Sequence, residues 1–332
     1  MHWISDPSTG EWLRGRLDDP WTSSMHSVVP RGYPAYARLL HPGVVRSLPD
    51  RPVPSIEDWQ RLPLEEQDRL IDLFRDEPVT WAETAAAFGT TLHPLAQWQR
   101  LVRTPTDGDW RTRIAPDGRE FTAPMEGALA AETVATIAAH LAGHTTTPDA
   151  GIAALWEGFG GLLGHLGHGP SRVFFSIGGD GDVDPNRADP NHRAMLDRSI
   201  HDPLNTAFRK PTWQEGILSR EVSEGPRLAL VDRTYVLFSA SARELADPEW
   251  ILHAPWRDLP GEAHGFPPSA QSPTLLWPDD RAWVLVSEID FDSTVVAGSA
   301  ELIAALSADP ALEVVPLAEG SDLHWDADEV NR

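Results

Sequence analysis

The chain has 332 residues, with 50 acidic residues against 27 basic ones and a formal net charge of -23. Hydrophobic residues make up 41 % and charged residues 23 %, a globular composition that excludes wholesale disorder. Because the negative charge repels phosphate backbones and anionic lipid, we expect neither nucleic acid nor a membrane surface as a partner. The sequence contains no cysteine, which excludes disulfides, thiolate zinc sites and thiol nucleophiles.

The first residues, Met1–Pro7, have neither the charged region nor the apolar region of a signal peptide. No segment approaches the roughly 20 apolar residues that are needed to span a bilayer. We therefore expect a cytoplasmic protein.

The first 145 residues are predicted to be mainly helical. Thr80 and Glu83 have the spacing of a capping box, in which each side chain bonds to the other residue's backbone amide. The helix that they begin is predicted to end at Gly89, since glycine readily adopts the left-handed conformation of a helix end. Further helices are predicted at Leu64–Arg75, Pro94–Val102 and Met125–Ala142.

The second half of the chain contains the best strand candidates. Leu228–Ser239 and Ala282–Phe291 are rich in apolar and β-branched residues. Ser299 is predicted to cap a short helix over Ala300–Leu306, and Leu312–Val315 follows as another strand. This last run has the order of a strand–helix–strand unit.

These elements predict an α+β fold, in which a mainly helical N-terminal part packs on a mixed or antiparallel β-sheet in the C-terminal part. The boundary is placed at residue 145, so the parts are 1–145 and 146–332. They form either two lobes or one compact unit.

Fourteen tryptophans occur between Trp3 and Trp325, and most tryptophans are buried anchors whose N–H finds a partner. No serine-hydrolase elbow, phosphate-binding loop or kinase motif is present. Tryptophan and arginine are common interface anchors. The leading hypothesis is therefore a non-catalytic module that binds a protein or a small ligand through a tryptophan-lined groove. Its expected binding residues are Trp156, Trp277, Arg281 and Trp283.

The competing hypothesis is a metal-assisted hydrolase. Glu288, Asp290 and Asp292 alternate along a predicted strand, so their carboxylates would share one face at its end. Such a cluster could hold Mg²⁺, with Asp290 and Asp292 as ligands, or supply a general acid and base.

An arginine network could instead neutralise these carboxylates. Residues 281 and 288 differ by seven, an odd number, so Arg281 lies on the opposite strand face unless a bulge intervenes. We expect the closest cation to Asp290 or Asp292 to come from another segment, with Arg227 or Arg233 as the candidates.

Histidines offer a further candidate metal site. His140 and His144 have the spacing that places two imidazoles on one helix face. Gly143 is expected to end the helix between them, which leaves His144 as a separate metal candidate. The alternating Asp180, Asp182 and Asp184 resemble half of a calcium loop, without its turn glycine and its final glutamate.

Several short sequence segments occur in a distinctive order along nearly the whole chain: Val29–Arg38, Thr80–Glu83, Trp156–Gly158, Trp277–Trp283 and Glu288–Thr294. Together they resemble a family of proteins from high-GC actinobacteria for which no activity is established. The resemblance implies a cytosolic protein and carries no catalytic residues with it.

Overall fold

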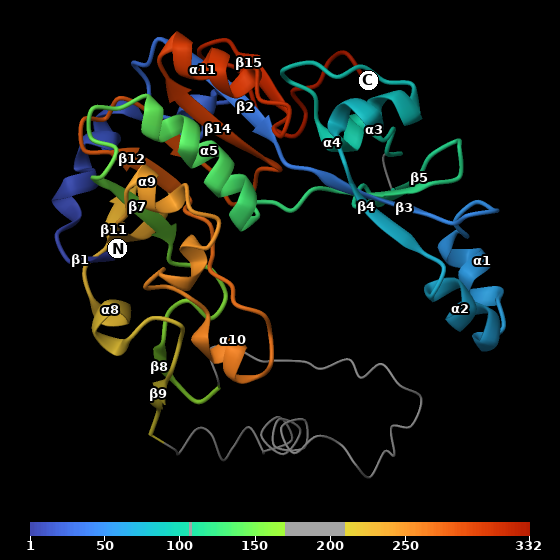
Figure 1. The fold of residues 1–332 in the computed structure, drawn as a ribbon, viewed down its shortest axis with the longest axis horizontal. Helices are drawn as coiled ribbons and strands as arrows, with labels where there is room; N and C mark the ends of the chain where they lie inside the picture. The colour runs from blue at the N-terminus through green and yellow to red at the C-terminus, as the bar shows by residue number, and fades with distance from the viewer. Residues whose placement is uncertain (106–107, 170–209) are drawn as a thin grey trace.

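The structure is a computed structural model that describes residues 1–105, 108–169 and 210–332 (Figure 1). Its main feature is a nine-stranded sheet in which every neighbouring pair is antiparallel. In spatial order the strands are β1 (His2–Ile4), β11 (Arg233–Ser239), β7 (Gly151–Trp156), β12 (Leu275–Pro278), β13 (Val284–Val286), β14 (Ser293–Gly298), β2 (Ala35–Leu40) and β15 (Val314–Leu317), with β10 (Leu228–Leu230) beside β11.

Both faces of this sheet are buried. Helices α5 (Ala131–Gly143), α9 (Ala242–Leu245) and α11 (Ala300–Ser307) cover one face (Figure 1). The other face packs against the 3-10 helices η1 (Pro7–Arg16) and η2 (Met25–Ser27). Side chains alternate between the two cores, so covering both faces explains why the strands are almost continuously apolar.

A smaller lobe carries its own antiparallel sheet. Its strands, in spatial order, are β4 (Arg75–Val79), β3 (Gly43–Ser47), β6 (Glu120–Thr122) and β5 (Thr112–Ile114). Helices α3 (Trp81–Phe88) and α4 (Trp98–Leu101) pack on it around a core that includes Phe121. The rings of Trp81 and Trp98 meet edge to face, with centroids 5.5 Å apart.

The remaining elements are short. Helices α1 (Ile56–Arg61) and α2 (Leu64–Ile71) lie at the far end of the β3–β4 pair (Figure 1). Strands β8 (His165–Gly167) and β9 (Thr212–Gln214) form a separate two-stranded sheet. Three further short helices are α8 (Arg220–Glu224), η3 (Trp250–Leu252) and α10 (Leu259–Ala263) in the described chain. None of the helices in the described ranges is long and apolar enough to cross a membrane.

Helix α3 is held at both ends as its sequence predicts. Thr80 and Glu83 form the capping box, and Gly89 ends the helix with a φ of 64°. A more distant contact adds to this: the Glu313 carboxylate accepts the amide protons of Trp81 and Ala82 at 2.7 and 2.8 Å. The small lobe is therefore bonded to the segment just before β15 of the large sheet.

The predicted fold, a helical N-terminal part packed on a C-terminal sheet, is wrong. Strands β1 to β6 all lie before residue 145, and β1 and β2 belong to the large sheet. Their partners are remote, as in the pairing of Leu40 with Ser293. Short strands of this kind give little local signal, because their stability comes from the strands and layers that they contact.

Two strand predictions also need correction. Leu228–Ser239 is a hairpin rather than one strand, and it turns at Asp232, whose φ is 65°. In the segment 282–291 only Val284–Val286 is a strand, because a turn follows at Ile289 and Asp290. The Ser299 cap and the helix after it are confirmed, and β14 and β15 flank β2 on its two sides.

Replacing Thr80 with alanine removes the hydroxyl that accepts the Glu83 amide at 3.1 Å. We expect this change to lower the free energy of unfolding by about 1 kcal/mol, since one helix-end donor loses its partner. Urea unfolding followed by tryptophan fluorescence measures the effect. Thr80→Ser keeps the hydroxyl and should stay close to the wild type; equal losses in the two variants would contradict the capping role.

Candidate functional site

A cleft of about 680 Å³ lies between the large sheet and the small lobe. The large sheet contributes β2, the β10–β11 turn and the loop between β13 and β14. The small lobe contributes α4 and the segment after it, and the rest of the lining comes from the segment around η2, from Glu126 and from residues 323–325. Clefts between structural units are common places for small-molecule sites.

Arg38 lies at the base of the cleft and is only 2 % exposed. Its guanidinium donates to Asp292 at 3.0 Å, to Ser293 Oγ at 2.7 Å and to the Ala96 carbonyl at 2.6 Å. It also lies over the Trp81 ring, 5.1 Å from the centroid. Burial lowers the pKa of Arg38, and the neighbouring Asp292 carboxylate opposes that change. One buried cation therefore joins β2, the loop after β13 and the small lobe.

Arg233 neutralises part of the acidic loop. Its guanidinium pairs with Glu288 at 3.2 Å and with Asp290 at 2.8 Å. Burial raises the pKa of Glu288, while Arg233 acts in the opposite direction. The expected Arg233 contact is confirmed. Arg281 lies instead over Trp12.

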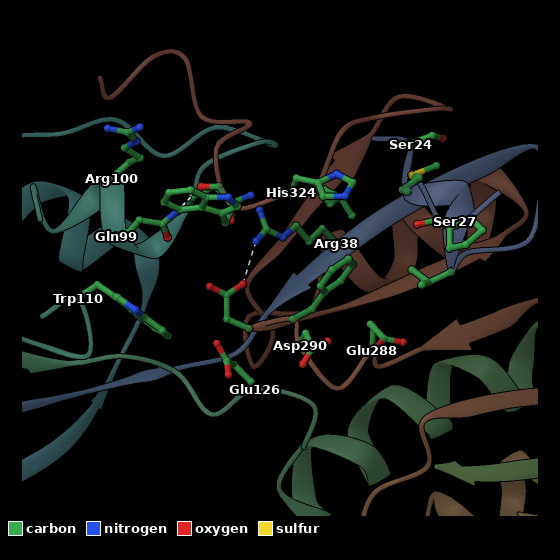
Figure 2. Close-up of a pocket in the computed structure, with 18 of the residues that line it drawn as sticks. Ser24, Ser27, Arg38, Gln99, Arg100, Trp110, Glu126, Glu288, Asp290 and His324 are labelled. Carbon is green, nitrogen blue, oxygen red and sulfur yellow. Dashed lines mark hydrogen bonds and ion pairs between the residues drawn. The ribbon is translucent and has the colours of Figure 1, made fainter. Parts of the chain in front are cut away.

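Glu126 is the unpaired carboxylate of the cleft. Within the described chain it has no hydrogen bond or ion pair, and Figure 2 shows it on the same side of the cleft as Glu288 and Asp290. Partial burial and then the charge of Asp292 raise its pKa, Arg111 opposes them, and Asp290 adds a smaller increase. The cleft as a whole is lined by five carboxylates (Glu126, Asp232, Glu288, Asp290 and Asp292) and three arginines (Arg38, Arg100 and Arg233), which leaves two surplus negative charges.

The opposite wall is formed by α4 and its neighbours, where Figure 2 shows Gln99 and Arg100. Arg100 pairs with no carboxylate in the described ranges. Three aromatic residues and a histidine also line the cleft: Trp110, Phe291, Trp325 and His324. Asp322 holds His324 through Nδ1 at 2.9 Å, and Trp325 is 72 % exposed.

Two of the predicted tryptophans are core residues and do not line the cleft. Trp277 and Trp283 are 2 % and 0 % exposed, and Trp283 donates its N–H to the Leu141 carbonyl at 2.9 Å. Trp156 is partly buried, with Arg233 6.0 Å from its ring centroid. The cleft is lined instead by Trp110 and Trp325. In the sequence each of these two tryptophans is next to an aspartate, Asp109 or Asp326, and such a polar neighbour could have marked them as surface residues.

The predicted metal ligands are separated. Glu288 is buried, Asp290 is exposed beside Arg233, and Asp292 bonds Arg38, so no common strand face forms. Among the residues that the structure describes, no three His, Cys, Asp or Glu side chains are grouped to hold a metal ion.

Helix α5 ends between His140 and His144, as the sequence predicts. Helix α5 ends at Gly143, so His140 and His144 do not continue on one helical face. The imidazole of His140 bonds Asp309 through Nε2 at 2.7 Å. The acidic loop 180–184 lies outside the described residues.

No family model, curated protein or solved structure matches the chain. The charges and aromatic rings of the cleft, and their positions, are therefore what indicates its function.

Replacing Asp292 with asparagine leaves the buried Arg38 without its anionic partner. We expect the free energy of unfolding to fall by about 3 kcal/mol, because an uncompensated buried charge is costly. The matched control is Asp290→Asn, whose side chain is 71 % exposed in its ion pair and which should cost less than about 1 kcal/mol. Urea denaturation compares them; equal effects would show that Arg38 does not depend on Asp292.

Proposed function

We propose that the protein is a non-catalytic module that binds a small organic cation in the cleft between the sheet and the small lobe. The observation that carries the proposal is the surplus of two carboxylate charges over arginine charges in the lining of the cleft, with Glu126 unpaired in the described chain. A cationic ligand would satisfy Glu126 without breaking the ion pairs of Arg38 and Arg233.

The aromatic lining supports the same ligand class. Trp110, Phe291 and Trp325 line the cleft, and a ring face attracts an ammonium or guanidinium group by about 0.5–2 kcal/mol. Carboxylates supply the charge contact and the rings supply apolar contact, which together suit an amine with a hydrocarbon body. The proposal keeps the sequence hypothesis of a tryptophan-lined groove but replaces the tryptophans that it named with Trp110 and Trp325.

Benzylamine and benzyl alcohol provide a matched test, because they share a ring and differ in charge. We expect the wild type to bind benzylamine more tightly, and Glu126→Gln to weaken that binding roughly fivefold, the equivalent of about 1 kcal/mol. Titration calorimetry at low salt measures both. Glu132→Gln makes the same charge change on the exposed face of α5 and should have no effect.

The pH dependence of benzylamine affinity provides a second test of the same site. The pKa of Glu126 is raised above its ordinary value of 4.5, so the carboxylate is protonated at a higher pH than usual. Affinity for benzylamine should therefore fall as the pH drops towards that raised pKa, and the fall should be smaller in Glu126→Gln. Equal affinity for the amine and the alcohol, or identical pH profiles in the two proteins, would overturn the proposal.

The second candidate is a hydrolase, metal-assisted or not, that uses the cleft carboxylates. Raised pKa values at Glu288 and Glu126 favour it, because perturbed carboxyl groups in one cleft are typical of general acids and bases. The arginine pairing of Glu288, Asp290 and Asp292 favours the binding module.

Hydrolysis of p-nitrophenyl phosphate and p-nitrophenyl acetate, with and without Mg²⁺, tests this candidate. Glu288→Gln should lower turnover at least roughly 100-fold if Glu288 transfers a proton. Glu132→Gln again serves as the control. A wild-type protein with no turnover above buffer would exclude hydrolysis of these two ester classes.

A further inference from the structure

A second cluster of charged and aromatic side chains lies outside the cleft, around the ring of Trp12. The guanidinium carbons of Arg16 and Arg281 are 5.1 and 4.9 Å from the Trp12 centroid. Arg16 is also 5.7 Å from the Tyr33 ring. Trp277 fixes Trp12 from the protein side, packing edge to face with ring centroids 6.1 Å apart.

Both arginines lack an acidic partner. In the described parts of the chain, neither Arg16 nor Arg281 forms an ion pair, although the protein has 50 acidic residues. Neighbouring arginines behave differently: Arg14 pairs with Glu11 at 2.9 Å, and Arg31 pairs with Asp18. Two positive charges at one ring therefore remain uncompensated in a strongly acidic protein.

The nearest acidic residue in sequence is engaged elsewhere. Asp280 accepts hydrogen bonds from the hydroxyl groups of Thr145 and Thr146, at 2.7 and 2.6 Å, and from the Thr146 amide at 2.7 Å. These bonds, opposed by partial burial, lower its pKa to about 2. Asp280 thus stays charged in the turn and leaves Arg281 without a partner.

Two buried donors point to a missing acceptor. The buried Trp12 N–H has no hydrogen-bond partner among the described residues, and the buried Tyr33 hydroxyl meets only the Arg16 side chain, which is itself a donor. Tyr33 is 8 % exposed, and both arginines act electrostatically on its hydroxyl. Buried polar groups without partners are uncommon, because each costs about 1–3 kcal/mol. Four donor groups therefore gather here, and within the described chain the only acceptor among them is the Tyr33 oxygen that Arg16 reaches.

We propose that Arg16, Arg281, Tyr33 and Trp12 form an anion site for a phosphate group, either free phosphate or the phosphate of a larger molecule. Arginine suits phosphate because its planar fork donates to two oxygens at once. A tetrahedral group also accepts from several directions, which matches donors supplied by two arginines and two ring systems. None of these four residues lines the acidic cleft, so the two sites take ligands of opposite charge.

Titration calorimetry with inorganic phosphate, glycerol 3-phosphate and acetate at low ionic strength tests the site. We expect saturable binding of the two phosphates by the wild type and weaker binding of acetate. Arg281→Gln and Arg16→Gln should each lower phosphate affinity roughly tenfold, as expected for loss of one charge-assisted pair. Tighter binding of glycerol 3-phosphate than of phosphate would assign the site to phosphate esters, and the reverse order to the free ion.

Two further variants separate binding from folding. Tyr33→Phe keeps the ring and removes only the hydroxyl, so it should weaken phosphate binding while circular dichroism stays unchanged. Arg243→Gln removes an exposed arginine that pairs with Asp149 at 2.7 Å, and it should bind phosphate like the wild type. Equal affinity in wild type and Arg281→Gln, no saturable phosphate binding, or acetate binding as tight as phosphate would overturn the proposal.

Discussion

The buried guanidinium of Arg38 is the interaction on which the cleft depends. A charge removed from water is tolerated only when several good acceptors surround it. Arg38 finds them in Asp292, Ser293 and the Ala96 carbonyl, which belong to the large sheet and to the small lobe. Satisfying this one side chain therefore fixes the loop after β13 against the segment that leads into α4. The two structural units are held together at the point where the cleft forms.

The charge of the cleft follows from that arrangement. Asp292 is committed to Arg38, while Arg233 is shared between Glu288 and Asp290. Glu126 enters the same region from another segment and forms no ion pair in the described chain, although Arg111 acts on it electrostatically. The resulting negative surplus is the basis on which we propose a cationic ligand for the cleft. The surroundings of Trp12 show the opposite pattern, because Arg16 and Arg281 meet there while Asp280 is bonded to threonines.

The sequence predicted the helix caps correctly but not the length of every helix, since the helices predicted from Pro94 and Met125 begin at Trp98 and Ala131. The capping box at Thr80 and Glu83, the Ser299 cap and the helix ends at Gly89 and Gly143 all depend on contacts within a few residues. Strands depended on remote partners and were predicted less well. Strand β2 was missed altogether, and the predicted strand over 282–291 shortened to three residues.

The sequence by itself determined the acidic charge, the absence of thiol chemistry and the helix caps, whereas the strand-face argument about Arg281 and Asp290 assumed a longer strand than the three residues of β13. Only the tertiary structure decided which tryptophans are buried and which line the cleft. It also decided that Arg38 pairs with Asp292, 254 positions away in the chain. The physical reason is that a helix cap is a hydrogen bond between residues close in the sequence. The charged cleft is formed by segments far apart in the sequence, which meet only in the folded protein.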